Sequence, residues 1–302
     1  MFQKLMARFL VLISSFGFGG ITYGALPPVN LGHTSFMDGV AGPGTLVEQS
    51  FIQYKASEFI DSDKNDIAEG DLTTTSLVTL IAHISDVKVM GAYYGAEILI
   101  PTVNVDFNLF GDEETSGLGD ISVSPLILQW PSIEYWGVNF SQRLNLNVSL
   151  PTGKYKSRNN LNIGSNTYIF NPHYAATLQF TPRIETSLRF HYLWNGENDN
   201  PTEQSGFDTT QAGQAIHVNF AGSYMLSQQL RAGLSSYYLT QVTEQKINGI
   251  SQDDSKESVF AIGGGLLFKN SLVNLHLNAY RELEAKNRTK GERFVFKLSK
   301  VF

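Results

Sequence analysis

Histidine and arginine residues recur at alternating polar positions in the middle of the chain. His173 and His191 flank a short polar turn at residues 181–183. If this turn holds three residues, Phe180 pairs with Ile184, and His173 then lies opposite His191. Two adjacent imidazoles can bind a metal or relay protons, and they can equally be polar side chains that line water. We expect no metal here and keep both histidines as candidate ligand-binding residues.

Two arginines occupy the same kind of position as these histidines. Arg143 and Arg189 lie on the polar faces of alternating segments, and His217, His276, Glu185 and Lys297 lie on such faces elsewhere. A guanidinium group can orient an anionic ligand such as an aromatic carboxylate. Arg143 and Arg189 are therefore further candidates for ligand binding.

All of these residues lie in segments whose hydrophobicity alternates at period two. From Val138 to Leu150, apolar residues share one face and polar residues the other, and helical periodicity is scarce in the chain. Continued along the chain, the pattern predicts 12 strands near residues 50–60, 73–85, 87–101, 119–130, 136–150, 166–180, 184–194, 212–225, 229–241, 258–268, 271–281 and 292–302. Many of these strands are long enough to cross a bilayer obliquely.

The predicted connections alternate between tight and long. Tight turns are expected at residues 85–86, 131–135, 181–183, 227–228 and 269–270, and long polar loops at 61–71, 102–118, 151–165, 195–211, 242–257 and 282–291. This order is typical of a bacterial barrel, in which both termini lie on the side of the short periplasmic turns. We predict an all-β protein: a single transmembrane antiparallel up-and-down β-barrel of about 12 strands, apolar outside and polar inside.

The first residues have the order of a secretory signal peptide. Lys4 and Arg8 precede an apolar stretch at residues 9–18, and the small residues Gly24 and Ala25 follow. We expect residues 1–25 to be a signal peptide that is cleaved after Gly24 or Ala25. Residues 26–49 then form an N-terminal segment, and residues 50–302 form the barrel.

Charge and cysteine content exclude several classes of function. The precursor has a net charge of -6, and removal of Lys4 and Arg8 leaves 20 basic against 28 acidic residues, or -8. This balance argues against nucleic acid as a partner. The chain has no cysteine, which excludes disulfides and thiolate metal sites.

The segment before the first predicted strand is rich in glycine and proline but also holds large apolar residues. His33, Phe36 and Asp38 lie in it. We hypothesise that it folds into the lumen as a plug or gate and that these three residues meet a ligand there. The alternative is a loose periplasmic leader, because chain termini are often disordered.

Three strings resemble a known family. Residues 26–44 are LPPVNLGHTSFMDGVAGPG, residues 117–130 are GLGDISVSPLILQW and residues 150–155 are LPTGKY. Together they resemble the phenol meta-pathway degradation-like, or SphA-type, family of outer-membrane barrels. The resemblance implies a channel or transporter for aromatic or other hydrophobic compounds in the outer membrane of a Gram-negative bacterium. Its expected partners are the small ligand, outer-membrane lipid and lipopolysaccharide, and the barrel-assembly machinery. It implies no cofactor and supplies no catalytic residues.

Two other classes remain as alternatives. An outer-membrane enzyme of the phospholipase type needs a serine near its histidine, but Leu193 stands two residues after His191. We therefore expect no enzyme. The second alternative is a non-conducting structural barrel.

Overall fold

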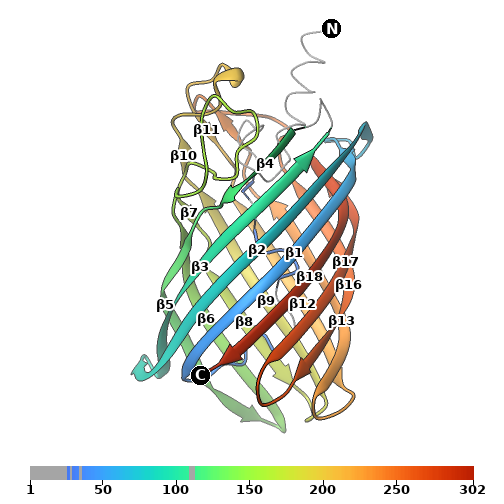
Figure 1. The fold of residues 1–302 in the computed structure, drawn as a ribbon. Coiled ribbons are helices and arrows are strands. Elements are labelled where there is room, and N and C mark those ends of the chain that lie inside the picture. The colour runs from blue at the N-terminus through green and yellow to red at the C-terminus, as the bar shows by residue number, and fades with distance from the viewer. Residues whose placement is uncertain (1–25, 28, 34–35, 109–112) are drawn as a thin grey trace.

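The chain forms a closed antiparallel β-barrel of 12 strands (Figure 1). This computed structural model describes residues 26–27, 29–33, 36–108 and 113–302, so the expected signal peptide lies outside the described residues. In the described part, no helix is long and apolar enough to cross a membrane. The one short helix there is the 3-10 turn η1 (Glu203–Ser205).

The barrel strands follow one another around the ring in chain order. They are β1 (Gly44–Ile60), β2 (Asp66–Val89), β3 (Ala92–Phe107), β5 (Ser122–Tyr135), β6 (Val138–Ser149), β8 (His173–Gln179), β9 (Ile184–Asn195), β12 (Ala215–Met225), β13 (Leu230–Gln241), β16 (Ser258–Lys269), β17 (Asn274–Lys286) and β18 (Arg288–Val301). Short strands β4 (Glu113–Leu118) and β7 (Ile169–Phe170) extend this wall. A separate small sheet contains β10 (Glu197–Asn198), β11 (Thr210–Gln211), β14 (Lys246–Ile247) and β15 (Ile250–Ser251).

The first and last strands close the ring. β1 pairs with β18 from Leu46 opposite Val301 to Ile60 opposite Arg288, and it pairs with β2 along its other edge. In hydrocarbon, a backbone N–H or C=O without a partner costs several kcal/mol, so a transmembrane sheet must have no free edge. The pairing of β1 with β18 removes the last edge.

The two ends of the barrel differ in their connections. One end, called here the turn end, holds short turns and the start of β1 and end of β18, and the other, the loop end, holds the long connections and the small sheet (Figure 1). This sorting agrees with the sequence prediction except between β17 and β18, where Asn287 alone joins the two strands, so the long loop expected at residues 282–291 is wrong. β1 begins at Gly44, however, so the N-terminal segment ends at residue 43 rather than 49.

Two predicted turns are wrong. β2 and β3 join at Met90–Gly91, and β5 and β6 join at Trp136–Gly137, with positive φ at all four residues, as type I′ turns require. The expected turns at residues 85–86 and 131–135 are register shifts inside pairs of strands, between Ile84 and Lys88 and between Trp130 and Ile133. Turn-forming residues there produce bulges rather than reversals of the chain.

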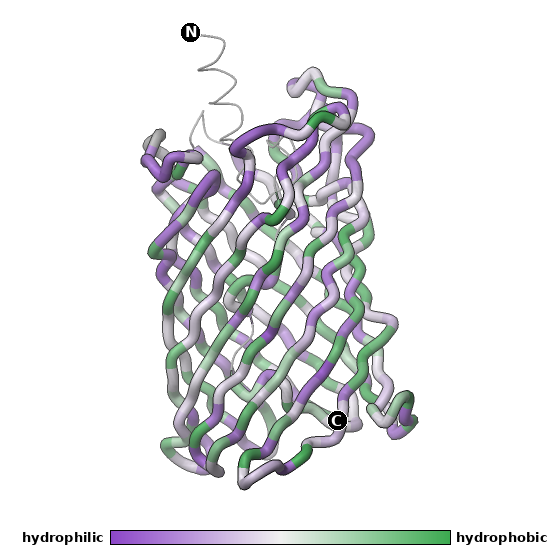
Figure 2. The backbone as a smooth tube through the Cα atoms, turned by 180° about the vertical axis from the view of Figure 1, so that it is seen from behind, coloured by the Kyte–Doolittle hydropathy of each residue, from purple (hydrophilic) through white to green (hydrophobic). Residues whose placement is uncertain are grey.

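The outward face is apolar, and the inward face is only partly polar. Large apolar side chains such as Leu77, Phe220 and Leu234 are exposed on the outside. Figure 2 shows hydrophilic residues in the long loops at the loop end. Inward positions include many polar residues, but β2 and β3 present apolar side chains to the lumen. These are Val78, Leu80, Ala82, Ile84, Leu99 and Val103. The expectation of a polar interior therefore holds for part of the inner wall and not for β2 and β3.

An arginine substituted on the outer face of the barrel tests whether that face contacts lipid. Leu234 is 77% exposed on β13, and we expect Leu234→Arg to lower the free energy of unfolding in lipid vesicles by about 2 to 4 kcal/mol, because the charge meets hydrocarbon. Ile250 is 68% exposed in a loop-end hairpin, so Ile250→Arg should change it by less than about 0.5 kcal/mol. Urea titration of both variants in vesicles measures the difference. Equal stability of the two variants would contradict the lipid-facing placement of Leu234.

Candidate functional site

The N-terminal segment is residues 26–43, and its described residues, 26–27, 29–33 and 36–43, lie along the lumen from the loop end to the turn end. The backbone N–H of Leu26 donates to Glu257, just before β16. The N–H of Gly32 donates to Asn219 Oδ1 at 2.7 Å near the middle of β12, and the N–H of Gly39 donates to Thr177 Oγ1 at 2.8 Å. The described residues of the segment are thus bound to the inner wall at several heights.

An ion pair fixes the lower part of the segment to the wall. Arg189 donates from Nε to Asp38 Oδ2 at 2.8 Å and from Nη2 to Asp38 Oδ1 at 2.6 Å. Both side chains are largely buried, at 14% and 11% exposure. Two parallel charge-assisted bonds of this kind are strong and directional. We call this pair the Asp38–Arg189 latch.

Close packing at Gly39 accompanies the latch. A methyl group added to Gly39 would lie 2.6 Å from the backbone nitrogen of Thr177 and 2.7 Å from the backbone oxygen of Ser141. The carbonyl oxygen of Gly39 also accepts a hydrogen bond from Gln129 Nε2 at 3.2 Å. The segment therefore touches the backbones of β6 and β8 here, which leaves no room for a side chain.

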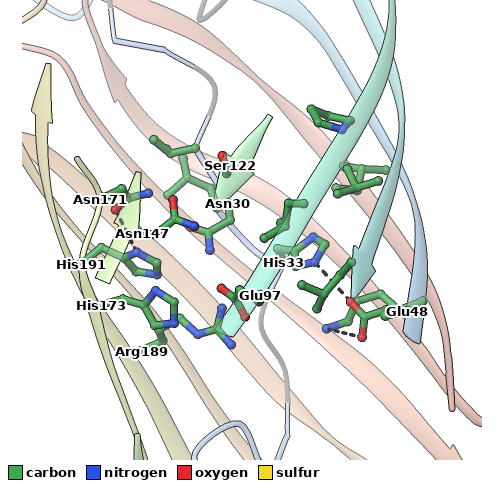
Figure 3. Close-up of a pocket in the computed structure, with 18 of the residues that line it drawn as sticks. Asn30, His33, Glu48, Glu97, Ser122, Asn147, Asn171, His173, Arg189 and His191 are labelled. Atoms are coloured by element: carbon green, nitrogen blue, oxygen red, sulfur yellow. Dashed lines mark hydrogen bonds and ion pairs between the residues drawn. The ribbon is translucent and has the colours of Figure 1, made fainter. Parts of the chain in front are cut away.

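A second group of charges binds the segment on the opposite side. His33 Nε2 lies 3.4 Å from Glu48 Oε1 on β1, and Lys297 Nζ on β18 lies 4.0 Å from Glu48 Oε2. Ser50 Oγ also donates to Glu48 at 3.1 Å. Figure 3 shows His33 and Glu48 facing each other across the pocket from Arg189.

Three histidine rings stack side by side on the inner wall. His173 lies opposite His191, as the three-residue turn predicts, and His217 on β12 lies opposite His191 on its other side. Ring centroids are 4.7 Å apart for the first pair and 3.9 Å for the second. Asn171 Oδ1 is 3.0 Å from His191 Nδ1. Nε2 of each of the three rings is buried without a hydrogen-bond partner, and His173 and His191 line the cavity, so these two offer a polar atom to a bound molecule.

Arg143 lies on the same wall as these histidines. Its Nε donates to Asn145 Oδ1 at 3.1 Å, and no carboxylate of the described residues lies within 4.0 Å of it. Glu97 of β3 faces this region and accepts a bond from Ser124 at 3.0 Å (Figure 3). Glu97 and Asp38 offset the charges of the two arginines, so the site is close to neutral rather than strongly cationic.

These groups surround one cavity of about 600 Å³. One wall is the apolar inner face of β2 and β3, and the other carries Arg143, His173, Arg189 and His191. A mostly apolar cavity with a few convergent polar groups is the usual form of a small-molecule site. The described residues contain no group of three histidine or carboxylate side chains that can hold a metal ion.

All seven candidate residues from the sequence line this cavity: His33, Phe36, Asp38, Arg143, His173, Arg189 and His191. Phe36 is almost fully buried against Ala221 and Leu267, so it holds the segment to the wall more than it faces the cavity. The sequence analysis did not find Glu48 or Thr177 as contacts of the segment. It also missed the apolar wall, although every second residue from Val78 to Ile84 is apolar and these residues share one face of the strand.

The fold and this lined cavity define a transmembrane β-barrel whose lumen holds a segment of its own chain. The chain belongs to the family described as putative MetA-pathway of phenol degradation, whose model matches residues 56–298. No curated protein matches the chain.

Solved structures resemble the fold. An outer membrane channel from Pseudomonas putida F1 has a TM-score of 0.76 at 16% identity, over 87% of this chain and 97% of that chain. The β domain of the Bordetella autotransporter BrkA has a TM-score of 0.48 at 10% identity, over 86% of this chain and 100% of that chain. At such low identity, the likeness to the channel shows the fold alone.

We expect the Asp38–Arg189 latch to hold the segment against the inner wall. Asp38→Asn leaves Arg189 without its ionic partner, and we expect the free energy of local opening at residues 36–43 to fall by about 2 kcal/mol. Hydrogen exchange of this peptide, followed by mass spectrometry, should then be about thirtyfold faster. Asp63→Asn, at an exposed residue near the loop end, is the matched control and should leave the exchange unchanged. Equal exchange in Asp38→Asn and the unmodified protein would show that the latch does not hold the segment.

Proposed function

We propose that this protein is an outer-membrane channel for the uptake of small hydrophobic or aromatic compounds in a Gram-negative bacterium. In that membrane the turn end faces the periplasm and the loop end faces outward, as in bacterial barrels with short periplasmic turns. The single observation that carries the proposal is the cavity between the apolar wall of β2 and β3 and the polar wall of β6, β8 and β9. Membership in a family described by phenol degradation supports the same class of compound.

The N-terminal segment is the gate of this channel in our proposal. Its described residues cross the lumen and are held by the latch, by Gly39 and by His33, beside the cavity. A segment held by polar bonds can move without unfolding the barrel, because the wall strands pair with one another and not with the segment. Conduction then requires displacement of residues near Gly39.

The polar wall orients the ligand. Arg143 donates hydrogen bonds, and the free Nε2 atoms of His173 and His191 lie beside it, so the polar group of an aromatic compound finds partners there while its ring rests on Leu80 and Leu99. The proposal assigns no catalytic residue, metal or cofactor. Its remaining partners are outer-membrane lipid, lipopolysaccharide and the barrel-assembly machinery.

Current through single channels in planar bilayers tests the gate. We expect removal of residues 26–43 to raise the conductance several-fold. Gly39→Ala should also raise the open fraction, because its methyl group meets the backbone of Thr177 and Ser141. Gly42→Ala is the matched control, since a methyl group there meets no atom within 4 Å. Absence of current in every form would favour a non-conducting structural barrel, and equal current with and without the segment would refute the gate.

A pair of matched ligands tests the polar wall. Arg143→Met should weaken binding of benzoate by about 10- to 100-fold, which corresponds to a lost charge-assisted hydrogen bond of roughly 1.5 to 3 kcal/mol. Binding of toluene should change by less than about threefold, because toluene has no polar group for Arg143. Equilibrium dialysis with the refolded barrel measures both, and Arg158→Met in an exposed loop is the control. Equal loss for the two compounds would remove Arg143 from the site.

A further inference from the structure

The first described residue of the N-terminal segment is buried at the loop end of the lumen. Leu26 is 3% exposed and packs in an apolar cluster with Leu193, Leu239 and Val259. Its backbone nitrogen donates to Glu257 Oε1 at 3.0 Å. The position of this nitrogen is therefore fixed by both the side chain and the backbone.

Glu257 is a buried carboxylate with incomplete charge compensation. It is 2% exposed, and its nearest cationic atom is Arg288 Nη1, 3.8 Å from Oε2. Burial raises the pKa of Glu257 to about 7, against the opposing effects of Arg288 and of the Leu26 N–H. A buried carboxylate of this kind gains most from a second positive charge in contact with it. The contact atom nearest to it on the segment is the nitrogen of Leu26.

The sequence places a cleavable bond next to this nitrogen. Gly24 and Ala25 are the small residues at the end of the expected signal peptide, and either can precede the cleaved bond. Cleavage after Ala25 turns the nitrogen of Leu26 into the α-ammonium group of the mature chain. Cleavage after Gly24 leaves it a neutral peptide N–H.

We infer that Glu257 is a binding site for the mature chain's own α-ammonium group, formed when the signal peptide is cleaved after Ala25. The ion pair between Leu26 and Glu257 anchors the segment at the loop end, while its other end continues into β1 at the turn end. Pro27 follows directly and favours an extended conformation at Leu26, which keeps the ammonium group directed along the chain axis rather than into a helical turn. This inference goes beyond the proposed channel, since it needs only the barrel and the segment.

The positive charge at the nitrogen of Leu26 exists only after the signal peptide is cleaved. An ammonium group offers three donors and a full positive charge, whereas a peptide nitrogen offers one donor and none. The unprocessed chain therefore cannot complete the compensation of Glu257. Anchoring by this ion pair therefore requires that the signal peptide has been removed.

Mass spectrometry of the protein purified from outer membranes is the first test. We expect the N-terminal peptide to begin at Leu26. A chain that begins at Ala25 or at any other residue overturns the inference. This measurement needs no variant and does not depend on conduction, so it fails or succeeds separately from the channel proposal.

Chemical labelling of the α-amine is the second test. Reductive methylation near pH 7 of the folded barrel should modify Leu26 at least about tenfold more slowly than in the urea-unfolded chain, because one unit of raised amine pKa lowers the reactive fraction tenfold. Glu257→Gln keeps the size of the side chain and should restore most of the reactivity. Glu284→Gln removes a surface carboxylate that pairs with Lys64 and should have no effect.

Two results of the labelling would refute the ion pair. One is equally fast labelling of the folded and unfolded chains. The other is protection that persists unchanged in Glu257→Gln, since burial alone would then explain it. Electrophoretic mobility without heating shows that each variant is folded before it is labelled.

Discussion

Closure of the sheet is the constraint on which the rest of this structure depends. A strand edge exposed to lipid leaves backbone groups without partners, and no side chain on the outer face can compensate for them. The pairing of β1 with β18 satisfies the last edge, and it also sets the width of the lumen. The cavity, the polar wall and the path of the N-terminal segment all follow from a ring of this size.

The N-terminal segment fills part of the lumen of this barrel. Side chains alone leave space, and the chain fills it with its own first residues. Leu26 and Leu31 join the inward apolar residues near the loop end, and Asp38 meets Arg189 lower down. The charged groups of the segment, His33 and Asp38, have their ionic partners on the wall, because an unpaired charge in this interior is costly. What remains is the cavity beside β2 and β3.

Much of the fold follows from the sequence, because alternation at period two is clear in most wall strands. The register of His173 with His191 also follows, since a three-residue turn joins their strands and fixes the pairing. The stacking of His217 on His191 does not, because a long loop joins β9 to β12 and sets no register. The turns at Met90–Gly91 and Trp136–Gly137 were missed because Ser85, Asp86 and Pro131 have turn-forming side chains but lie at bulges.

The candidate site was predictable as a set of residues but not as an arrangement. Inward positions can be identified from alternation, so Arg143, Arg189 and the histidines were found. Which wall the N-terminal segment approaches depends on contacts between residues far apart in the chain, such as Asp38 with Arg189, and no local pattern encodes them. The apolar inward face of β2 and β3 could not be identified from the sequence, because both faces of these strands are rich in apolar residues and the alternation is weak.

The path of the N-terminal segment has a consequence for the two ends of the chain. β1 and β18 meet at the turn end, yet Leu26 lies beside Glu257 at the opposite end. A polypeptide fused in front of Leu26 would therefore emerge among the long loops, whereas one fused after Phe302 would emerge at the turn end. Leu26 and Phe302 thus lie toward opposite faces of the membrane that the barrel crosses.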